Sequence, residues 1–342
     1  MALEGIWFFL WGLLWAIFFM TDGFDLGIGT LYPFLGKTDD EKRMMINAIG
    51  PLWDGNEVWL ITAGGVTFAA FPKVYAVMFS SLYSPLMIIL FALILRGVSF
   101  EFRGKVDNPA WRRIWDGSIF VGSAVPTLLF GVVFANIFRG LPINEDGIFH
   151  GSLVTLINPY ALLGGFLFLS LFTLHGSLWL LIRTEGELQR RALKTAYLLW
   201  PLVVVMILVF LAASRFSTGL YGNYQASPIL FSFLLVPVIG LIGIRLFIKS
   251  HSFFKAWFSS CLTIVGTIFF GIIGLYPNLF PSSLNSEHNL TAYNSASSPM
   301  TLKIMLVVVL IFIPAVIGYQ IWAYHLFKGK VTKADLSYEE AL

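Results

Sequence analysis

The fold class is decided by one stretch near the N-terminus, Gly5-Ile-Trp-Phe-Phe-Leu-Trp-Gly-Leu-Leu-Trp-Ala-Ile-Phe-Phe-Met-Thr-Asp-Gly-Phe-Asp-Leu-Gly-Ile-Gly-Thr30. An α-helix needs about 20 apolar residues to cross the hydrocarbon core of a bilayer, and this stretch is longer than that. Glu4 is the only charge before it, and neither a basic segment nor a small-residue cleavage site marks it as a signal peptide. The stretch therefore predicts a membrane helix that stays in the mature protein.

The rest of the chain shares this apolar character. Of its 342 residues, 57% are hydrophobic and only 12% are charged, whereas about 25% of the residues in an average soluble protein are charged. This composition excludes a soluble enzyme, and the single cysteine, Cys261, excludes a secreted disulfide scaffold. We therefore expect an all-α, polytopic membrane protein.

Further apolar stretches predict the number of membrane helices. We place eight of them after the first span of about 5–30, at about 54–71, 75–96, 117–138, 158–182, 196–214, 228–247, 257–276 and 301–326. The sequence thus predicts nine transmembrane helices in one integral membrane domain, 1–342, with the two termini on opposite sides of the membrane.

The basic residues predict the orientation. With nine spans, 18 of the 22 Lys and Arg fall in the loops after spans one, three, five and seven and in the C-terminal tail. Loops rich in Lys and Arg stay in the cytoplasm, so we expect an external N-terminus and a cytoplasmic C-terminus. Because the net charge of +3 comes from these loops, we expect no nucleic acid partner.

Four carboxylates gather near the predicted cytoplasmic face. Asp22 and Asp25 lie inside the first span, and Asp54 and Glu57 begin the second. Each pair has the i, i+3 spacing that places side chains on one helix face. Arg96, at the end of the third span, is the cation within reach. Ionisable residues inside a membrane span are costly and point to function.

This cluster has two interpretations. It is either a route that conducts protons from the cytoplasm, or a structural ion pair between Asp25 and Arg96 with the other acids in headgroup water. The glycines Gly23, Gly27 and Gly29 predict close contact between helices, and Gly64-Gly65 has the same expected use.

Histidines are too scarce in the spans for a bis-histidine haem site, which needs two facing ligands. Of the five histidines, only His175 lies well inside a predicted span. We interpret it as a hydrogen-bonded structural residue and expect no cofactor bound by this chain directly.

Three motifs occur in order along the first third of the chain. They are Asp22-Gly-Phe-Asp-Leu-Gly-Ile-Gly29, then Trp53-Asp-Gly-Asn-Glu-Val-Trp-Leu-Ile-Thr-Ala-Gly-Gly65 running on to Phe68-Ala-Ala-Phe-Pro72, and Arg96-Gly-Val-Ser-Phe-Glu-Phe-Arg103. They resemble the second subunit of cytochrome bd-type quinol oxidases. Between about 140 and 300 the resemblance is only one of hydropathy and length.

The resemblance implies a function as subunit II of a respiratory terminal oxidase that oxidises quinol and reduces dioxygen to water. In that family the larger subunit I binds the b-type and d-type haems and holds the quinol site. The second subunit is haem-free, stabilises the assembly and contributes a cytoplasmic proton path. It has two four-helix bundles and one peripheral helix. The resemblance also leaves room for a structural quinone in this chain and for a small accessory single-span subunit.

Site residues carry over from the motifs residue by residue. The family's proton-path acids match Asp25 and Asp54, its arginine matches Arg96, and Asp22 lies in the same motif. Glu57 stands where some members have an amide, so the resemblance implies no essential proton role for it. The resemblance places the chain in a bacterial or archaeal cytoplasmic membrane, in contact with lipids and quinone. The alternative from another class is a proton-coupled transporter, although we find no inverted repeat typical of such proteins.

Overall fold

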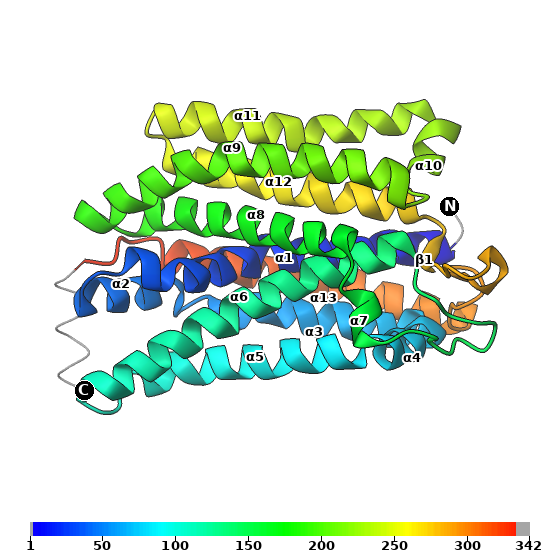
Figure 1. The fold of residues 1–342 in the computed structure, drawn as a ribbon, viewed down its shortest axis with the longest axis horizontal. Coiled ribbons are helices and arrows are strands. Elements are labelled where there is room, and N and C mark those ends of the chain that lie inside the picture. Colours follow the sequence, from blue (N-terminus) through cyan, green and yellow to red (C-terminus); the bar gives the residue numbers. More distant parts are fainter. Residues whose placement is uncertain (1–2, 333–342) are drawn as a thin grey trace.

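A computed structural model describes residues 3–332. Most helices run roughly parallel to one long axis (Figure 1). The elements are α1 Leu3–Leu35, α2 Asp39–Ile49, α3 Trp53–Ala70, α4 Pro72–Ser81, α5 Tyr83–Phe102, α6 Pro109–Arg139, α7 Leu153–Leu156, α8 Pro159–Arg183, α9 Gly186–Ser217, α10 Tyr221–Ala226, η1 Pro228–Leu234, α11 Leu235–Lys249, α12 Phe253–Leu275, β1 Asn278–Phe280, η2 Ser286–His288, β2 Leu290–Thr291 and α13 Pro299–Leu326. The all-α class is confirmed, with one small two-stranded sheet, β1–β2, beside it.

Within residues 3–332, eight helical segments are long and apolar enough to cross a bilayer: α1, α5, α6, α8, α9, η1 with α11, α12 and α13. The 18-residue helix α3 is not among them. Its first turns carry Asp54, Asn56 and Glu57, which lower its hydropathy. Nine crossings and the grouping into two four-helix bundles therefore stay predictions.

Two predicted spans differ from the observed helices. The stretch 75–96 is not one helix, because the chain breaks at Leu82 between α4 and α5. Pro85 causes this break, since it has no N–H for the carbonyl of Ser81. The stretch 228–247 begins as a 3₁₀ helix and becomes α-helical only at Leu235. Pro237 acts there in the same way, because it cannot donate to the carbonyl of Phe233.

Helix α1 is the centre of the bundle and packs against α3, α6, α8 and α12. Its contact with α8 depends on glycine, because a Cβ atom at Gly27 would overlap the carbonyl oxygen of Phe172. The expected use of small residues in close helix contact holds here. At Gly64 and Gly65 no other segment of the described chain lies within 4 Å of an added Cβ atom.

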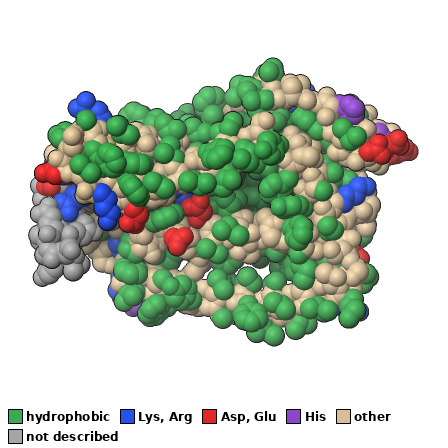
Figure 2. Space-filling model, turned by 90° about the horizontal axis from the view of Figure 1, so that it is seen from below, with side chains coloured by type: hydrophobic (Ala, Val, Ile, Leu, Met, Phe, Trp, Pro, Cys, Tyr) green, Lys and Arg blue, Asp and Glu red, His purple; other side chains and the backbone are tan. Residues whose placement is uncertain are grey.

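The directions of the helices follow from contacts at their two ends. Trp11 of α1 donates to Thr67 of α3 at 3.0 Å, and Asn56 of α3 donates to Asp25 of α1 at 2.7 Å, so these helices are antiparallel. Trp7 donates to the carbonyl of Leu302 at the start of α13. The rings of Phe24 and Tyr324, toward the other ends, have centroids 6.3 Å apart, so helices α1 and α13 are parallel. Figure 2 shows charged side chains mainly near the two ends, with a broad hydrophobic band between them.

Candidate functional site

The buried charge of Arg96 joins three helices. This side chain, on α5, is completely buried. Its Nη2 donates to Asp22 Oδ1 on α1 at 2.9 Å and to Glu57 Oε2 on α3 at 3.1 Å. The sequence favoured Asp25 as the partner of Arg96, and the structure differs: no ion pair joins these two residues among the described contacts. The i, i+3 spacing predicts a shared face but not which acid on that face meets the cation.

Asp25 is held by neutral side chains instead. It is also completely buried. Its Oδ2 accepts a hydrogen bond from Asn56 Nδ2 at 2.7 Å, and Asn56 Oδ1 accepts one from Tyr324 Oη of α13 at 2.8 Å. We refer below to Asp22, Asp25, Asn56, Glu57, Arg96 and Tyr324 as the inner cluster. The amide of Asn56 connects α1, α3 and α13 at this point.

Several buried polar atoms of the inner cluster lack a hydrogen-bond partner in the described chain. Within residues 3–332, Asp22 Oδ2, Asp25 Oδ1 and the Nε and Nη1 of Arg96 have no hydrogen-bond partner. Buried polar atoms are normally paired because desolvating them is costly. Four such atoms lie together in the inner cluster.

Asp54 does not enter the inner cluster. It is exposed in the first turn of α3, three residues before Glu57. That spacing places both carboxylates on one helix face, and the Glu57 side chain is 20% exposed while it pairs with the fully buried Arg96. Side-chain exposure thus decreases from the surface to the interior in the order Asp54, Glu57, and then the buried pair Arg96 and Asp22.

Sequence reasoning missed Asn56 and Tyr324. Asn56 lies in the second quoted motif, and an amide inside an apolar helix is the signal that could have identified it. Gln320 is a similar case, since its Oε1 accepts from Trp59 Nε1 at 2.9 Å and its Nε2 donates to the carbonyl of Gly55 at 3.0 Å. These bonds fasten α13 to the first turns of α3.

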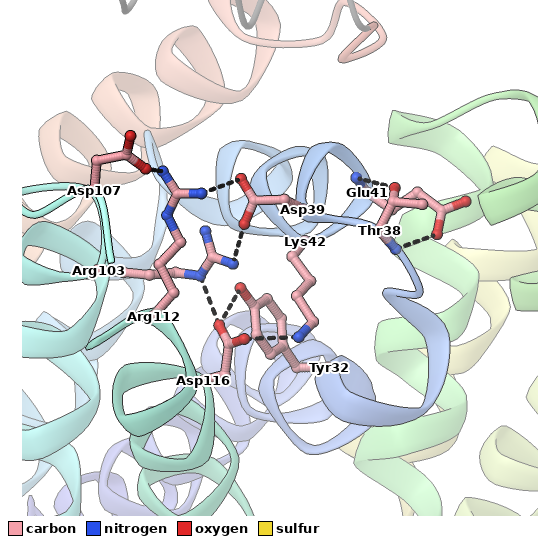
Figure 3. Close-up of polar contacts among 9 residues, drawn as sticks. All are labelled: Tyr32, Thr38, Asp39, Glu41, Lys42, Arg103, Asp107, Arg112 and Asp116. Atoms are coloured by element: carbon pink, nitrogen blue, oxygen red, sulfur yellow. Dashed lines mark hydrogen bonds and ion pairs between the residues drawn. The ribbon is translucent and has the colours of Figure 1, made fainter. Parts of the chain in front are cut away.

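A second group of charges, also missed from the sequence, joins α1, α2, α5 and α6 (Figure 3). Asp116 of α6 accepts from Arg103 Nε and Lys42 Nζ, both at 2.6 Å, and from Tyr32 Oη at 3.1 Å. Asp39 of α2 accepts from Arg103 Nη2 at 2.7 Å. We call this the outer network, and its members are Tyr32, Asp39, Lys42, Arg103, Arg112 and Asp116. It ties the ends of α1 and α5 to α2 and α6.

Glu41 fastens α2 to α9 at the same end of the bundle. Its Oε1 pairs with Arg191 Nη2 at 2.5 Å, and its Oε2 accepts from the backbone N–H of Lys37 and Thr38. Partial burial acts to raise the pKa of Glu41, but the hydrogen bonds from Arg191 and these two N–H groups outweigh it, so the pKa is lowered overall.

His175 is hydrogen-bonded through both ring nitrogens, as its structural interpretation expects. Nδ1 lies 2.6 Å from Ser260 Oγ, and Nε2 lies 2.9 Å from the carbonyl oxygen of Met20. Neither nitrogen is available to ligate haem iron. Among residues 3–332, no group of three or more His, Cys, Asp or Glu side chains could hold a metal ion.

Comparisons with known proteins place the chain in a family. The model of the family "Cytochrome bd terminal oxidase subunit II" matches residues 3–327. Cytochrome bd ubiquinol oxidase subunit 2 of Bacillus subtilis is 40% identical over 335 residues, which cover 98% of each chain. The chain belongs to the cytochrome bd oxidase subunit II family.

Two further similarities agree with this membership. Cytochrome bd-I ubiquinol oxidase subunit 2 of Escherichia coli is 35% identical over 371 aligned positions, covering 98% of this chain and 97% of the relative. The structure of bd oxidase from Geobacillus thermodenitrificans matches with a TM-score of 0.77 at 16% identity, over 95% of this chain and 97% of that one, which supports the fold. Family membership and the eight apolar helices make this bd oxidase subunit a multi-pass protein of the bacterial inner membrane.

Proposed function

We propose that this subunit II supports assembly with a larger haem-bearing subunit I and supplies part of a proton route from the cytoplasm to the site of dioxygen reduction. The observation that carries the proposal is the inner cluster, in which Asp25 is completely buried but keeps one oxygen without a partner in the described chain. A carboxylate in that condition can take up and release a proton without breaking an ion pair.

The proposed route has an order given by exposure. Asp54 collects protons at the cytoplasmic surface, and the partly exposed Glu57 passes them to the carboxylate of Asp22, beside Arg96. Asp25 is the inner relay. Asn56 donates a hydrogen bond of 2.7 Å to one oxygen of Asp25. The other oxygen of Asp25 has no partner in the described chain and takes up and releases the proton. Arg96 lies between Asp22 and Glu57 and donates a hydrogen bond to each of them.

This route accounts for energy conservation without a pumping cycle. Reduction of one O₂ to two water molecules consumes four electrons and four protons. If quinol releases its protons outside and the reaction takes its protons from the cytoplasm, each turnover separates charge across the membrane. The haems implied by the family supply electron transfer and dioxygen activation, and we assign them to subunit I because both nitrogens of His175 are occupied.

Partner binding is assigned to exposed apolar helix faces. Of the most apolar 18-residue stretch of α13, only 6% is buried within this chain. Helix α3 also exposes Ile61 and Phe68. Its glycines Gly64 and Gly65 leave room for a close helix neighbour. We propose that subunit I packs on this side and that the accessory single-span subunit, where present, also binds within the membrane.

The structural quinone is assigned to an apolar groove of about 680 Å³ between the start of α1, η1 and α12. Phe8, Phe233 and Phe269 line it with Tyr276, which suits a quinone ring and an isoprenoid tail. Substitution Phe269→Ala should lower the quinone recovered per purified complex by extraction, while Phe254→Ala, at an exposed position outside this groove, should not.

The subunit assignment is tested by purification. Haem absorbance and quinol-driven oxygen consumption should appear only when this chain co-purifies with a larger polypeptide. Stoichiometric haem on the isolated chain would contradict the haem-free assignment. Proton-coupled transport by the isolated chain would instead favour the transporter alternative.

We also propose one membrane domain over 1–342 with nine crossings, an external N-terminus and a cytoplasmic C-terminus. The parallel arrangement of α1 and α13 supports an odd number of crossings. In a Cys261→Ser background, an impermeant thiol reagent added to cells with a permeabilised outer envelope should label Glu145→Cys and not Glu185→Cys. Labelling of Glu185→Cys instead would reverse the orientation.

A further inference from the structure

A large open cavity lies at the end of the bundle that carries the outer network. Its volume is about 1120 Å³. It is lined by α2, the start of α3, the end of α5, the end of α8 and the segment that follows α13. Neither the inner cluster nor the apolar groove contributes to it, so it has no part in the proposed proton relay or quinone site.

The walls of this cavity carry an excess of positive charge. Six cations and three acids line it. The cations are Arg43, Arg103, Lys105, Arg112, Arg183 and Lys330. Two of the acids are already engaged, because Asp39 pairs with Arg103 and Arg112, and Asp107 pairs with Arg112 at 2.8 Å. The cations of the lining outnumber the acids, and this excess favours an anion.

Arg183 is the decisive residue of the cavity. Its side chain is only 4% exposed, and within residues 3–332 its Nε and Nη1 have no hydrogen-bond partner. A buried guanidinium with unpaired donors is costly and is normally paired with an acid or another acceptor. Its carbonyl holds the chain after α13 through the N–H of Val331 at 2.7 Å, which fixes the wall beside it.

We propose that this cavity binds a phosphate group, with Arg183 as its central ligand and Lys105 and Lys330 at its rim. Guanidinium groups match phosphate oxygens in a forked geometry, and lysines add charge. Basic pockets between membrane helices on the cytoplasmic side are sites for anionic lipid head groups. Trp53, Phe100 and Phe327 give the cavity apolar walls that an acyl chain can follow, so a phospholipid is the favoured source of the phosphate, and a soluble phosphate is the other.

The test uses the purified, delipidated complex and native mass spectrometry. Phosphatidylglycerol and inorganic phosphate are titrated separately, and phosphate is also used to compete with the bound lipid. Arg183→Gln should weaken binding about tenfold, the loss of one hydrogen-bonded charge contact. The matched control is Arg215→Gln, which removes an exposed arginine at the end of α9 away from the cavity, and it should bind as the unaltered complex does.

The two arms separate the two sources. Arg183-dependent binding of phosphatidylglycerol that inorganic phosphate does not displace assigns the site to a lipid. Arg183-dependent binding of inorganic phosphate alone assigns it to a soluble phosphate. Equal binding by the unaltered complex and Arg183→Gln in both arms overturns the proposal.

A second variant covers the case in which Arg183→Gln fails to assemble. Lys105 and Lys330 are both exposed, so the double substitution Lys105→Gln with Lys330→Gln should fold. It should weaken phosphate binding and reduce its salt dependence, by less than Arg183→Gln does. Unchanged affinity and salt dependence in the double variant would count against the site.

Discussion

Two charged clusters share helix α1. The inner cluster surrounds Asp22 and Asp25, and the outer network begins at Tyr32, which donates to Asp116 at 3.1 Å. In the outer network both oxygens of Asp116 accept hydrogen bonds. In the inner cluster, within the described chain, Asp22 and Asp25 each keep one oxygen without a partner.

This difference separates a structural role from a transport role. A carboxylate whose oxygens are all bound to cations is fixed in its ionised form and holds helices together. A buried carboxylate with a free oxygen can change its protonation state at a smaller cost. The comparison predicts that substitutions in the outer network affect stability, and that substitutions in the inner cluster affect turnover, unless they remove the buried cation.

Removal of that cation should have the largest effect. Arg96→Ala leaves Asp22 and Glu57 in the interior without their counter-charge, and breaking a buried pair costs roughly 3–5 kcal/mol. The yield of assembled complex and its haem content, measured from absorbance after purification, should fall strongly. Arg190→Ala is the control, because Arg190 forms only an exposed i, i+3 ion pair with Glu187. Normal assembly of Arg96→Ala would contradict the buried pairing.

Loss of the amide that holds Asp25 should come next. Asn56→Ala removes the donor to Asp25 and the acceptor of Tyr324, at a cost of about 1–3 kcal/mol for buried groups left unpaired. Oxygen consumption per haem should fall, since Asp25 loses its fixed orientation. Tyr324→Phe keeps the ring and removes only the hydroxyl, so its effect should be smaller. Equal turnover in Asn56→Ala and the unaltered complex would remove the positioning role.

The outer network should show the opposite behaviour. Asp116→Asn weakens its bonds to Arg103 and Lys42 and should lower the free energy of unfolding by about 1–3 kcal/mol. The melting temperature of the purified complex should fall, while oxygen consumption per haem stays the same. A selective loss of turnover in Asp116→Asn would mean that the two clusters do not differ as proposed.

The smallest expected effect is a pH dependence at Glu41. Because its pKa is lowered in the folded chain, the bond to Arg191 adds stability above the usual carboxyl pKa of about 4.3. That contribution should vanish as the pH falls through the lowered value. Between about pH 6 and about pH 3, the melting temperature should depend less steeply on pH in Glu41→Gln than in the unaltered complex. Glu187→Gln, which alters an exposed i, i+3 pair, is the control, and an equal change of slope in both variants would contradict the assignment.

The sequence predicted the helices better than it predicted their contacts. Apolar length was enough to locate helices such as α8 near 158–182, because the bilayer sets that length. It did not reveal the break at Leu82, which depends on a missing N–H at Pro85. Proline alone does not signal such a break, because Pro126 and Pro314 lie inside the continuous helices α6 and α13.

The candidate site was predicted by residue type and not by pairing. The motifs brought together Asp22, Asp25, Glu57 and Arg96, but the partner of Arg96 depends on how α1, α3 and α5 are rotated against each other. Spacing within one helix carries no information about that rotation. Tyr324 lies about 270 residues from Asn56, so only the packing of α13 shows that they meet.

The central claim is that Asp25 carries protons, and it is tested most directly by Asp25→Asn in the assembled complex. The amide keeps the size and hydrogen bonding of the carboxylate but cannot transfer a proton. We predict that oxygen consumption per haem falls about 100-fold, while haem content and melting temperature stay near those of the unaltered complex. Normal turnover per haem would contradict the relay, and loss of haem together with turnover would show that Asp25 only holds the helices together.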